Sequence, residues 1–108
     1  MPNGWDVKFL NENVEAEYEG LPKESRAKIS WIINIIKQEG IEELHEPYIK
    51  HLQDKLWEIR GKSGRAMYIT ITGKLVVILR CFTKKSNQTP QSEIELALRR
   101  LKEFDGDE

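Results

Sequence analysis

Three strand-like runs joined by short turns lie between residues 55 and 82, and they limit the fold most strongly. The runs are KLWEIR at 55–60, RAMYITIT at 65–72 and LVVILRCF at 75–82. Residues 61–64 form the first connection, and Thr72-Gly73-Lys74 forms a tight turn. Such short connections predict an antiparallel meander. The last run has four consecutive apolar residues, Val76 to Leu79, which predicts that it is the central strand.

Apolar residues at helical spacing predict two helices before this meander. The first helix has apolar residues at intervals of four and three, at Val14, Tyr18 and Leu21. The second has the i, i+3, i+4, i+7 pattern, at Ile29, Ile32, Ile33 and Ile36. We expect the first helix to end near Gly20. The second should run from Pro22 to Gly40, because proline suits a first helical turn and glycine suits the end of a helix.

Three other segments complete the predicted order of elements. Alternation of apolar and polar residues over 5–9 predicts a short edge strand, whereas mixed polarity and a central proline predict that 41–53 is a connection over the sheet. Thr89 is expected to cap a third helix, whose apolar residues are Ile94, Ala97, Leu98 and Leu101. The predicted order is β-α-α-β-β-β-α, an α+β fold with helices packed on a small antiparallel sheet.

The chain's length allows one domain, which we assign to residues 1–108. With 39% hydrophobic and 32% charged residues, the chain can bury one core and is not typical of disordered proteins. No apolar stretch approaches the roughly 20 residues that cross a bilayer, and the start, MPNGWDVKFL, lacks the apolar core of a signal peptide. We therefore expect a cytoplasmic protein that does not bind membranes.

Several kinds of chemistry are not expected from this sequence. The single cysteine, Cys81, excludes an internal disulfide and a multi-cysteine metal site, and its apolar strand predicts that it is packed rather than nucleophilic. Glycine-rich phosphate loops, GxSxG and HExxH are absent. His45 and His51 flank a proline without a third ligand at useful spacing, so we expect no metal and no cofactor.

Positive charge is concentrated in the second half of the chain. Residues 1–49 carry 5 Lys/Arg and 10 Asp/Glu, whereas residues 50–102 carry 12 Lys/Arg and 4 Asp/Glu. The last six residues, EFDGDE, add four acids, and we expect them to form a solvated end. A basic half between acidic segments predicts a surface for a polyanion.

The basic residues that follow strand ends should meet at one edge of the sheet. They are Arg60, Arg65, Arg80, Lys84 and Lys85. Strict alternation along the last strand would place Ile78, Arg80 and Phe82 on one face. Arginine binds phosphate with a planar fork, lysine adds a point charge, and an aromatic ring stacks on a base, so the set predicts a site for single-stranded RNA. The alternative is that Arg60 and Arg80 pair with Glu58, Glu93 or Glu95 and that Phe82 is part of the core.

Four motifs in the second half resemble those of a known toxin superfamily. LWEIR at 56–60, Arg65 with Tyr68 three positions later, and LRCFTKKSNQTPQSEIELALRRL at 79–101 resemble the RelE/ParE toxin superfamily in its HigB-like, phage-derived branch. That branch typically shows LWElR, RxxY, FxKKt and tPxxEielAxxR in this order. The resemblance covers residues 45–104 by motif, and the N-terminal elements by pattern. It implies a RelE-like α+β toxin of a type II toxin–antitoxin pair.

The resemblance also implies an activity and partners. Such toxins enter the ribosomal A site and cleave the messenger RNA there, without a cofactor. Their partner is a cognate antitoxin, in this branch usually a helix-turn-helix protein that neutralises the toxin and represses the operon. Two other functions are compatible with the sequence: a ParE-like gyrase inhibitor, which the basic residues argue against, and a non-catalytic RNA-binding phage protein.

The roles of single residues follow from the resemblance together with the chemistry of RNA cleavage. Arg65 matches the arginine that stabilises the transition state, and Arg60 is a second guanidinium. Lys84 and Lys85 would hold phosphates, and Phe82 would stack a base. Tyr68 would orient an arginine or, alternatively, pack beneath the sheet.

The general base is left open by the sequence. Some RelE-type members carry lysines on the strand that leads to the arginines, whereas this chain has Leu56 and Glu58. Glu46, in HEPY, resembles the glutamate base of another RelE-like branch. Glu58 and a Lys84 of lowered pKa are the other candidates.

Overall fold

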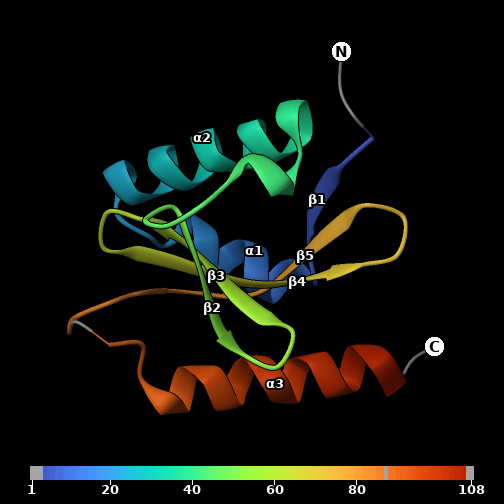
Figure 1. Ribbon diagram of the computed structural model, residues 1–108. Helices are drawn as coiled ribbons and strands as arrows, with labels where there is room; N and C mark the ends of the chain where they lie inside the picture. Colours follow the sequence, from blue (N-terminus) through green and yellow to red (C-terminus); the bar gives the residue numbers. More distant parts are fainter. Residues whose placement is uncertain (1–3, 87, 107–108) are drawn as a thin grey trace.

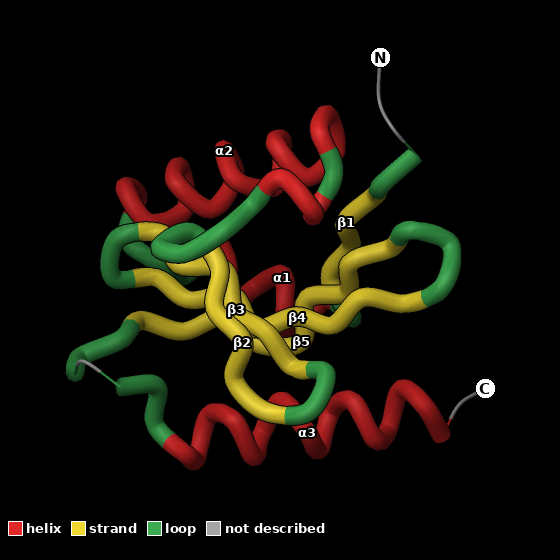
Figure 2. Tube along the Cα trace, in the orientation of Figure 1, coloured by secondary structure: helices red, strands yellow, loops and turns green. Residues whose placement is uncertain are grey.

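The computed structural model describes residues 4–86 and 88–106, and in this part of the chain a five-stranded sheet lies between layers of helices (Figure 1). The elements are β1 (Asp6–Phe9), α1 (Glu12–Glu19), α2 (Lys23–Glu39), a 3-10 helix η1 (Ile41–Glu43), β2 (Ile49–Gln53), β3 (Leu56–Gly61), β4 (Gly64–Ile71), β5 (Leu75–Thr83) and α3 (Gln91–Gly106). Figure 2 shows α2 on one side of the sheet and α3 on the other. The predicted α+β class and the three helices are confirmed.

The strands lie in the order β1-β5-β4-β3-β2. The predicted meander of β3, β4 and β5 is confirmed, and β1 is an edge strand as expected. Two predictions were wrong. The sheet is mixed, because β1 pairs parallel with β5, and β4 rather than β5 is the central strand.

The segment 41–53, predicted as a connection, contains η1 and the second edge strand, β2. Strand β2 pairs antiparallel with β3, and its register shifts between His51 and Gln53. Ile49 belongs to the core on the α2 side, and Leu52 packs against the core on the α3 side. The shift breaks the two-residue alternation by which an edge strand is recognised, so the sequence pattern hides this strand.

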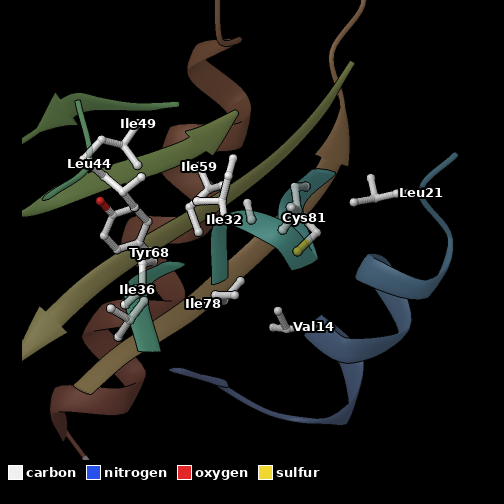
Figure 3. Close-up of a cluster of buried hydrophobic side chains, with 13 residues drawn as sticks. Val14, Leu21, Ile32, Ile36, Leu44, Ile49, Ile59, Tyr68, Ile78 and Cys81 are labelled. Atoms are coloured by element: carbon white, nitrogen blue, oxygen red, sulfur yellow. The ribbon is translucent and has the colours of Figure 1, made fainter. Parts of the chain in front are cut away.

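Two apolar cores lie on opposite faces of the sheet. The core under α1 and α2 contains the predicted stripe of α2, with Ile29, Ile32 and Ile36 fully buried, together with Tyr68 and Ile78 from the sheet (Figure 3). Among the described residues, the buried members of the core under α3 are Leu56, Met67, Ile69, Val77, Leu79, Phe82, Ile94, Ala97 and Leu101. The acidic end predicted to be solvated begins inside α3, and its last two residues lie outside the described part of the chain.

A bulge in β5 changes which residues share a face. Met67 pairs with Arg80, but the next residue, Tyr68, pairs with Ile78, so β5 carries one extra residue at this point. Ile78 therefore lies in the α2 core and Phe82 in the α3 core. The expectation that Ile78, Arg80 and Phe82 share a face was wrong because it assumed unbroken alternation.

The tip of the β3–β4 hairpin lies directly against α2. A Cβ atom on Gly61 would lie 2.7 Å from Ile29 Cγ1 and 3.0 Å from the Ile29 backbone nitrogen. On Gly64, a Cβ atom would lie 2.7 Å from Ser25 Cβ. These two glycines allow the helix to approach the hairpin closely.

Gly61→Ala is expected to lower the free energy of unfolding by about 1–3 kcal/mol, since the added methyl group pushes α2 away from the hairpin. Urea denaturation measures this change. Gly20→Ala is the matched control, because a Cβ atom there meets only backbone oxygens at 3.5 and 3.6 Å, which is ordinary contact. An equal loss of stability in both variants would contradict the assignment of the effect to close packing.

Candidate nucleic-acid interface

Four cations and one carboxylate gather on the α3 face of the sheet, near the β3–β4 turn. They are Lys50, Glu58, Arg60, Arg65 and Lys84, which we call the basic cluster. Lys50 lies opposite Glu58 on β2 and β3, and Arg60 lies opposite Arg65 on β3 and β4. Residues paired across two neighbouring strands lie on the same face of the sheet, and so do residues two apart on one strand. Strand pairing therefore places Lys50, Glu58, Arg60 and Arg65 on one face. The backbone N–H of Lys84 donates to the Ser63 carbonyl at 2.7 Å, which adds the fifth.

Arg65 is held in place from one side. Its side chain is 8% exposed, and its Nη1 donates to the carbonyl oxygens of Lys62 at 2.7 Å and Gly64 at 2.9 Å. Its Nε is buried without a hydrogen-bond partner among the described residues. Burial lowers the pKa of Arg65, Glu58 raises it and Arg60 lowers it further, but an arginine still stays charged at neutral pH. The two backbone carbonyls therefore hold the guanidinium of Arg65 in one orientation.

Glu58 is the buried carboxylate of the cluster. Its Oε1 accepts a hydrogen bond from Thr89 Oγ1 at 2.8 Å, and its Oε2 lies 3.6 Å from Arg60 Nε. The prediction that Thr89 caps α3 was wrong, because its hydroxyl is used by Glu58 and the helix begins at Gln91. The Thr89–Glu58 hydrogen bond fixes the segment before α3 against the basic cluster.

The basic cluster as a whole has a net positive charge, because it contains four cations and one carboxylate.

Lys84 has a lowered pKa, caused by desolvation and by the positive charges of Arg65 and Arg60, and opposed by Glu58. A lowered pKa increases the neutral fraction of the amine near neutral pH, which suits a group that takes up and releases a proton. Lys85 follows in the chain and is exposed.

Arg80 and Phe82, which were predicted to contact RNA, make contacts within the fold. Arg80 Nε lies 2.7 Å from Glu93 Oε1, and its Nη1 lies 2.9 Å from Glu17 Oε2. The hydrogen bond that Arg80 donates to Glu93 is the main reason that the pKa of Arg80 is raised. Phe82 is 7% exposed and packs in the α3 core. The structural alternative is confirmed for all three residues, because Arg80 pairs with Glu93, Arg60 lies 3.6 Å from Glu58, and Phe82 is part of the core.

Tyr68 lies on the opposite face of the sheet from Arg65, because residues three apart on a strand point to opposite sides. It therefore does not orient this arginine. Its side chain is 1% exposed in the α2 core, and burial raises the pKa of its hydroxyl well above the ordinary value. The alternative that Tyr68 packs beneath the sheet is confirmed.

Glu46 lies in a different cleft from Arg60 and Arg65. The cleft has a volume of 720 Å³ and is also lined by Trp57, Tyr68 and Thr70. A smaller cleft of 370 Å³ is lined by Arg60 and Arg65 together with Lys28, Pro47, Tyr48 and Lys62. Of the predicted catalytic residues, the structure thus groups Arg60, Arg65 and Lys84, and it places Glu46 and Tyr68 elsewhere.

Cys81 is buried, and burial raises its pKa to about 12, so the prediction of a packed thiol is confirmed. Within residues 4–86 and 88–106, no three His, Cys, Asp or Glu side chains come together as metal ligands would. In the same part of the chain, no helix is long and apolar enough to cross a membrane.

Lys50 was missed by the sequence reasoning. Because 41–53 was interpreted as a connection, no strand register was available to place Lys50 beside Glu58.

Comparison with protein families gives one match over most of the chain. A family model described as "Phage derived protein Gp49-like (DUF891)" matches residues 16–102. No curated protein matches the sequence.

Solved structures with the same fold are toxins of toxin–antitoxin systems. An arginine-to-alanine double mutant of Escherichia coli toxin RelE in the free state has a TM-score of 0.61 and 14% identity, covering 93% of this chain and 98% of that one. The RelE–RelB complex of Pyrococcus horikoshii OT3 has a TM-score of 0.60 and 20% identity, covering 75% and 96%. The RelBE2 complex of Mycobacterium tuberculosis has a TM-score of 0.56 and 19% identity, covering 78% and 100%. At these identities the likeness establishes a RelE-like fold.

Proposed function

This chain belongs to the Gp49-like family of phage-derived proteins, and on that premise we propose that it is the toxin of a toxin–antitoxin pair and cleaves messenger RNA in the ribosomal A site. The RelE-like fold supports the proposal, since the similar RelE proteins include a toxin and a toxin–antitoxin complex. The observation that carries it is the basic cluster, in which two backbone carbonyls hold Arg65 opposite Arg60.

The proposed reaction uses the 2′-hydroxyl of the substrate as the nucleophile. The enzyme must then remove one proton, stabilise a dianionic phosphorane and protonate the 5′-oxygen that leaves. Arg65 is proposed to bind the phosphorane oxygens, with Arg60 as the second guanidinium. Lys85 would bind a flanking phosphate.

Lys84 is the general base that we favour among the three candidates. Its lowered pKa supports proton transfer, and it lies beside the two arginines. Glu58 is fully buried and accepts a hydrogen bond from Thr89, and Glu46 lines the other cleft. We therefore assign Glu58 to positioning: its carboxylate holds Arg60 and Thr89.

The proposed partner is a cognate antitoxin of the helix-turn-helix type. The complexes of the similar RelE proteins, RelBE2 and RelE–RelB, support an antitoxin partner. A positively charged cluster also favours a partner that brings acidic side chains to it. Expression together with the neighbouring reading frame should suppress toxicity and yield a complex on purification.

Primer extension on a reporter message in cells that express the chain tests the proposal. Growth arrest accompanied by new 5′ ends spaced by codons within the translated region is expected. Growth arrest with an intact message and inhibited gyrase would contradict cleavage and favour the ParE-like alternative. Binding of RNA without arrest and without new ends would favour a non-catalytic RNA-binding protein.

A further inference from the structure

An exposed tryptophan on α2 is held beside an aromatic ring and a lysine. Trp31 is 47% exposed, and its ring centroid lies 5.7 Å from that of Tyr48 in an edge-to-face contact. The ammonium group of Lys28 lies 4.2 Å from the Trp31 ring and 5.1 Å from the Tyr48 ring. None of these side chains belongs to the two apolar cores as a buried member. A large indole left half-exposed next to a cation is a common feature of sites that bind flat, anionic ligands.

This surface is continuous with the basic cluster. The cleft of 370 Å³ that contains Arg60 and Arg65 also contains Lys28, Tyr48 and Lys62. A neighbouring hollow is lined by Trp31, Ala27 and Glu24, again with Lys28 and Lys62. The Lys62 carbonyl accepts the hydrogen bond from Arg65, so the turn that carries Lys62 joins the two regions. The positively charged surface thus extends from Arg65 past Lys62 at the tip of the β3–β4 hairpin to Lys28 beside Trp31. Glu24 is the carboxylate next to Trp31.

We propose that Lys28, Trp31, Tyr48 and Lys62 form a second RNA subsite, which binds an unpaired nucleotide next to the one that is cleaved. The base would stack on Trp31, and Lys28 and Lys62 would bind the adjoining phosphates. This inference rests on the proposed function, because it takes the basic cluster as the place of cleavage. Stacking on an aromatic ring tolerates any base, so the subsite would add affinity with little sequence preference.

The other exposed tryptophan has different surroundings. Trp57 is 37% exposed, lies 5.1 Å from the His51 ring and lines the 720 Å³ cleft with Glu42, Glu46 and Lys50. The two carboxylates offset the charge of Lys50, whereas the hollow at Trp31 is lined by Lys28 and Lys62 against Glu24 alone. Trp57 is therefore a matched control, equal in residue type and similar in exposure but placed where RNA is not favoured.

Binding of a dye-labelled single-stranded RNA with 2′-O-methyl groups tests the subsite, because this RNA cannot be cleaved through its 2′-oxygen. Fluorescence anisotropy should give a Kd about 5- to 100-fold higher for Trp31→Ala than for the unsubstituted protein. Trp57→Ala should change the Kd less than about 2-fold, because the base is proposed to stack on Trp31 and not on Trp57. Trp31→Phe should keep most of the affinity, since the phenyl ring still stacks.

A second variant keeps the test decisive if Trp31→Ala alters the fold. Lys62→Asn removes one charge at a position with φ of 57°, a conformation that asparagine tolerates. It should weaken binding and lower the slope of log Kd against log salt by about one.

The following outcomes would overturn the subsite: no binding by the unsubstituted protein at low salt, unchanged affinity in both Trp31→Ala and Lys62→Asn, or an equal loss in Trp57→Ala. Unchanged RNA affinity with weakened binding of the antitoxin would assign this surface to the protein partner. The proposed function can fail separately. If the protein cuts no message but Trp31→Ala still weakens RNA binding, the proposed subsite would stand and the proposed nuclease activity would be wrong.

Discussion

Arg65→Ala is expected to lower the rate of message cleavage by about 100- to 1,000-fold, the loss found when one preorganised donor to a developing oxyanion is removed. The reason is geometric. Two carbonyl groups fix the guanidinium, so it is held in place before the substrate arrives and needs no reorganisation during the reaction. The measurement is a single-turnover time course of cleavage on ribosomes programmed with a defined message. Binding to the ribosome should be nearly unchanged, because the other cations remain.

Two variants serve as controls for this result. Arg65→Lys keeps the charge but loses the planar fork, and it should recover only a small part of the rate. Arg99→Ala removes an exposed arginine from α3, on the surface of the same protein, and should cut at the normal rate. Thermal melting of all three shows whether they fold. Normal cleavage by a folded Arg65→Ala variant would show that the site assignment is wrong.

Tyr68→Ala is expected to lower the free energy of unfolding by about 3–5 kcal/mol, because it removes a large buried ring and leaves a cavity. Tyr68 is among the largest fully buried side chains and lies near Ile36, Leu44 and Ile49 in the α2 core (Figure 3). Chemical denaturation measures the loss. Any loss of cleavage activity in this variant should then match the loss of folded protein, and the folded molecules should cleave at the normal rate.

Tyr68→Phe separates packing from catalysis. It keeps the ring and removes the hydroxyl, so both the stability and the rate of cleavage should stay close to those of the unsubstituted protein. A folded Tyr68→Phe variant with cleavage reduced more than about 100-fold, a loss of the size typical of a general acid or base, would show that the hydroxyl takes part in the reaction. The assignment of Tyr68 to the core alone would then be wrong.

The helices and the meander were predictable because their signals are local. The stripe of Ile29, Ile32 and Ile36 reports one helix face, and the short turns after β3 and β4 leave antiparallel pairing as the only simple connection. Strand β2 and the parallel pairing of β1 were not predictable in this way. Both depend on contacts between distant segments, and the bulge at His51 to Gln53 removes the alternation that would mark an edge strand.

The candidate site was predictable in part for the same reason. The meeting of Arg60 and Arg65 follows from hairpin register, which a short turn fixes. The positions of Arg80 and Phe82 do not follow from hairpin register. The bulge in β5 determines which face of the sheet they lie on, and Arg80 pairs with Glu17, which comes from α1. For Tyr68 the sequence left two roles open, orienting an arginine or packing beneath the sheet. The strand geometry favours packing, because residues three apart on a strand lie on opposite faces.

Cleavage of a message with a single 2′-deoxynucleotide at the cut position tests the proposed chemistry most directly. The unsubstituted protein should cut the all-ribose message on the ribosome and leave a 5′-hydroxyl end, and it should fail at the deoxy position while still cutting the same message elsewhere. Equal cutting at the ribose and deoxy positions would contradict attack by the 2′-hydroxyl, and with it the assignment of the basic cluster to the phosphorane.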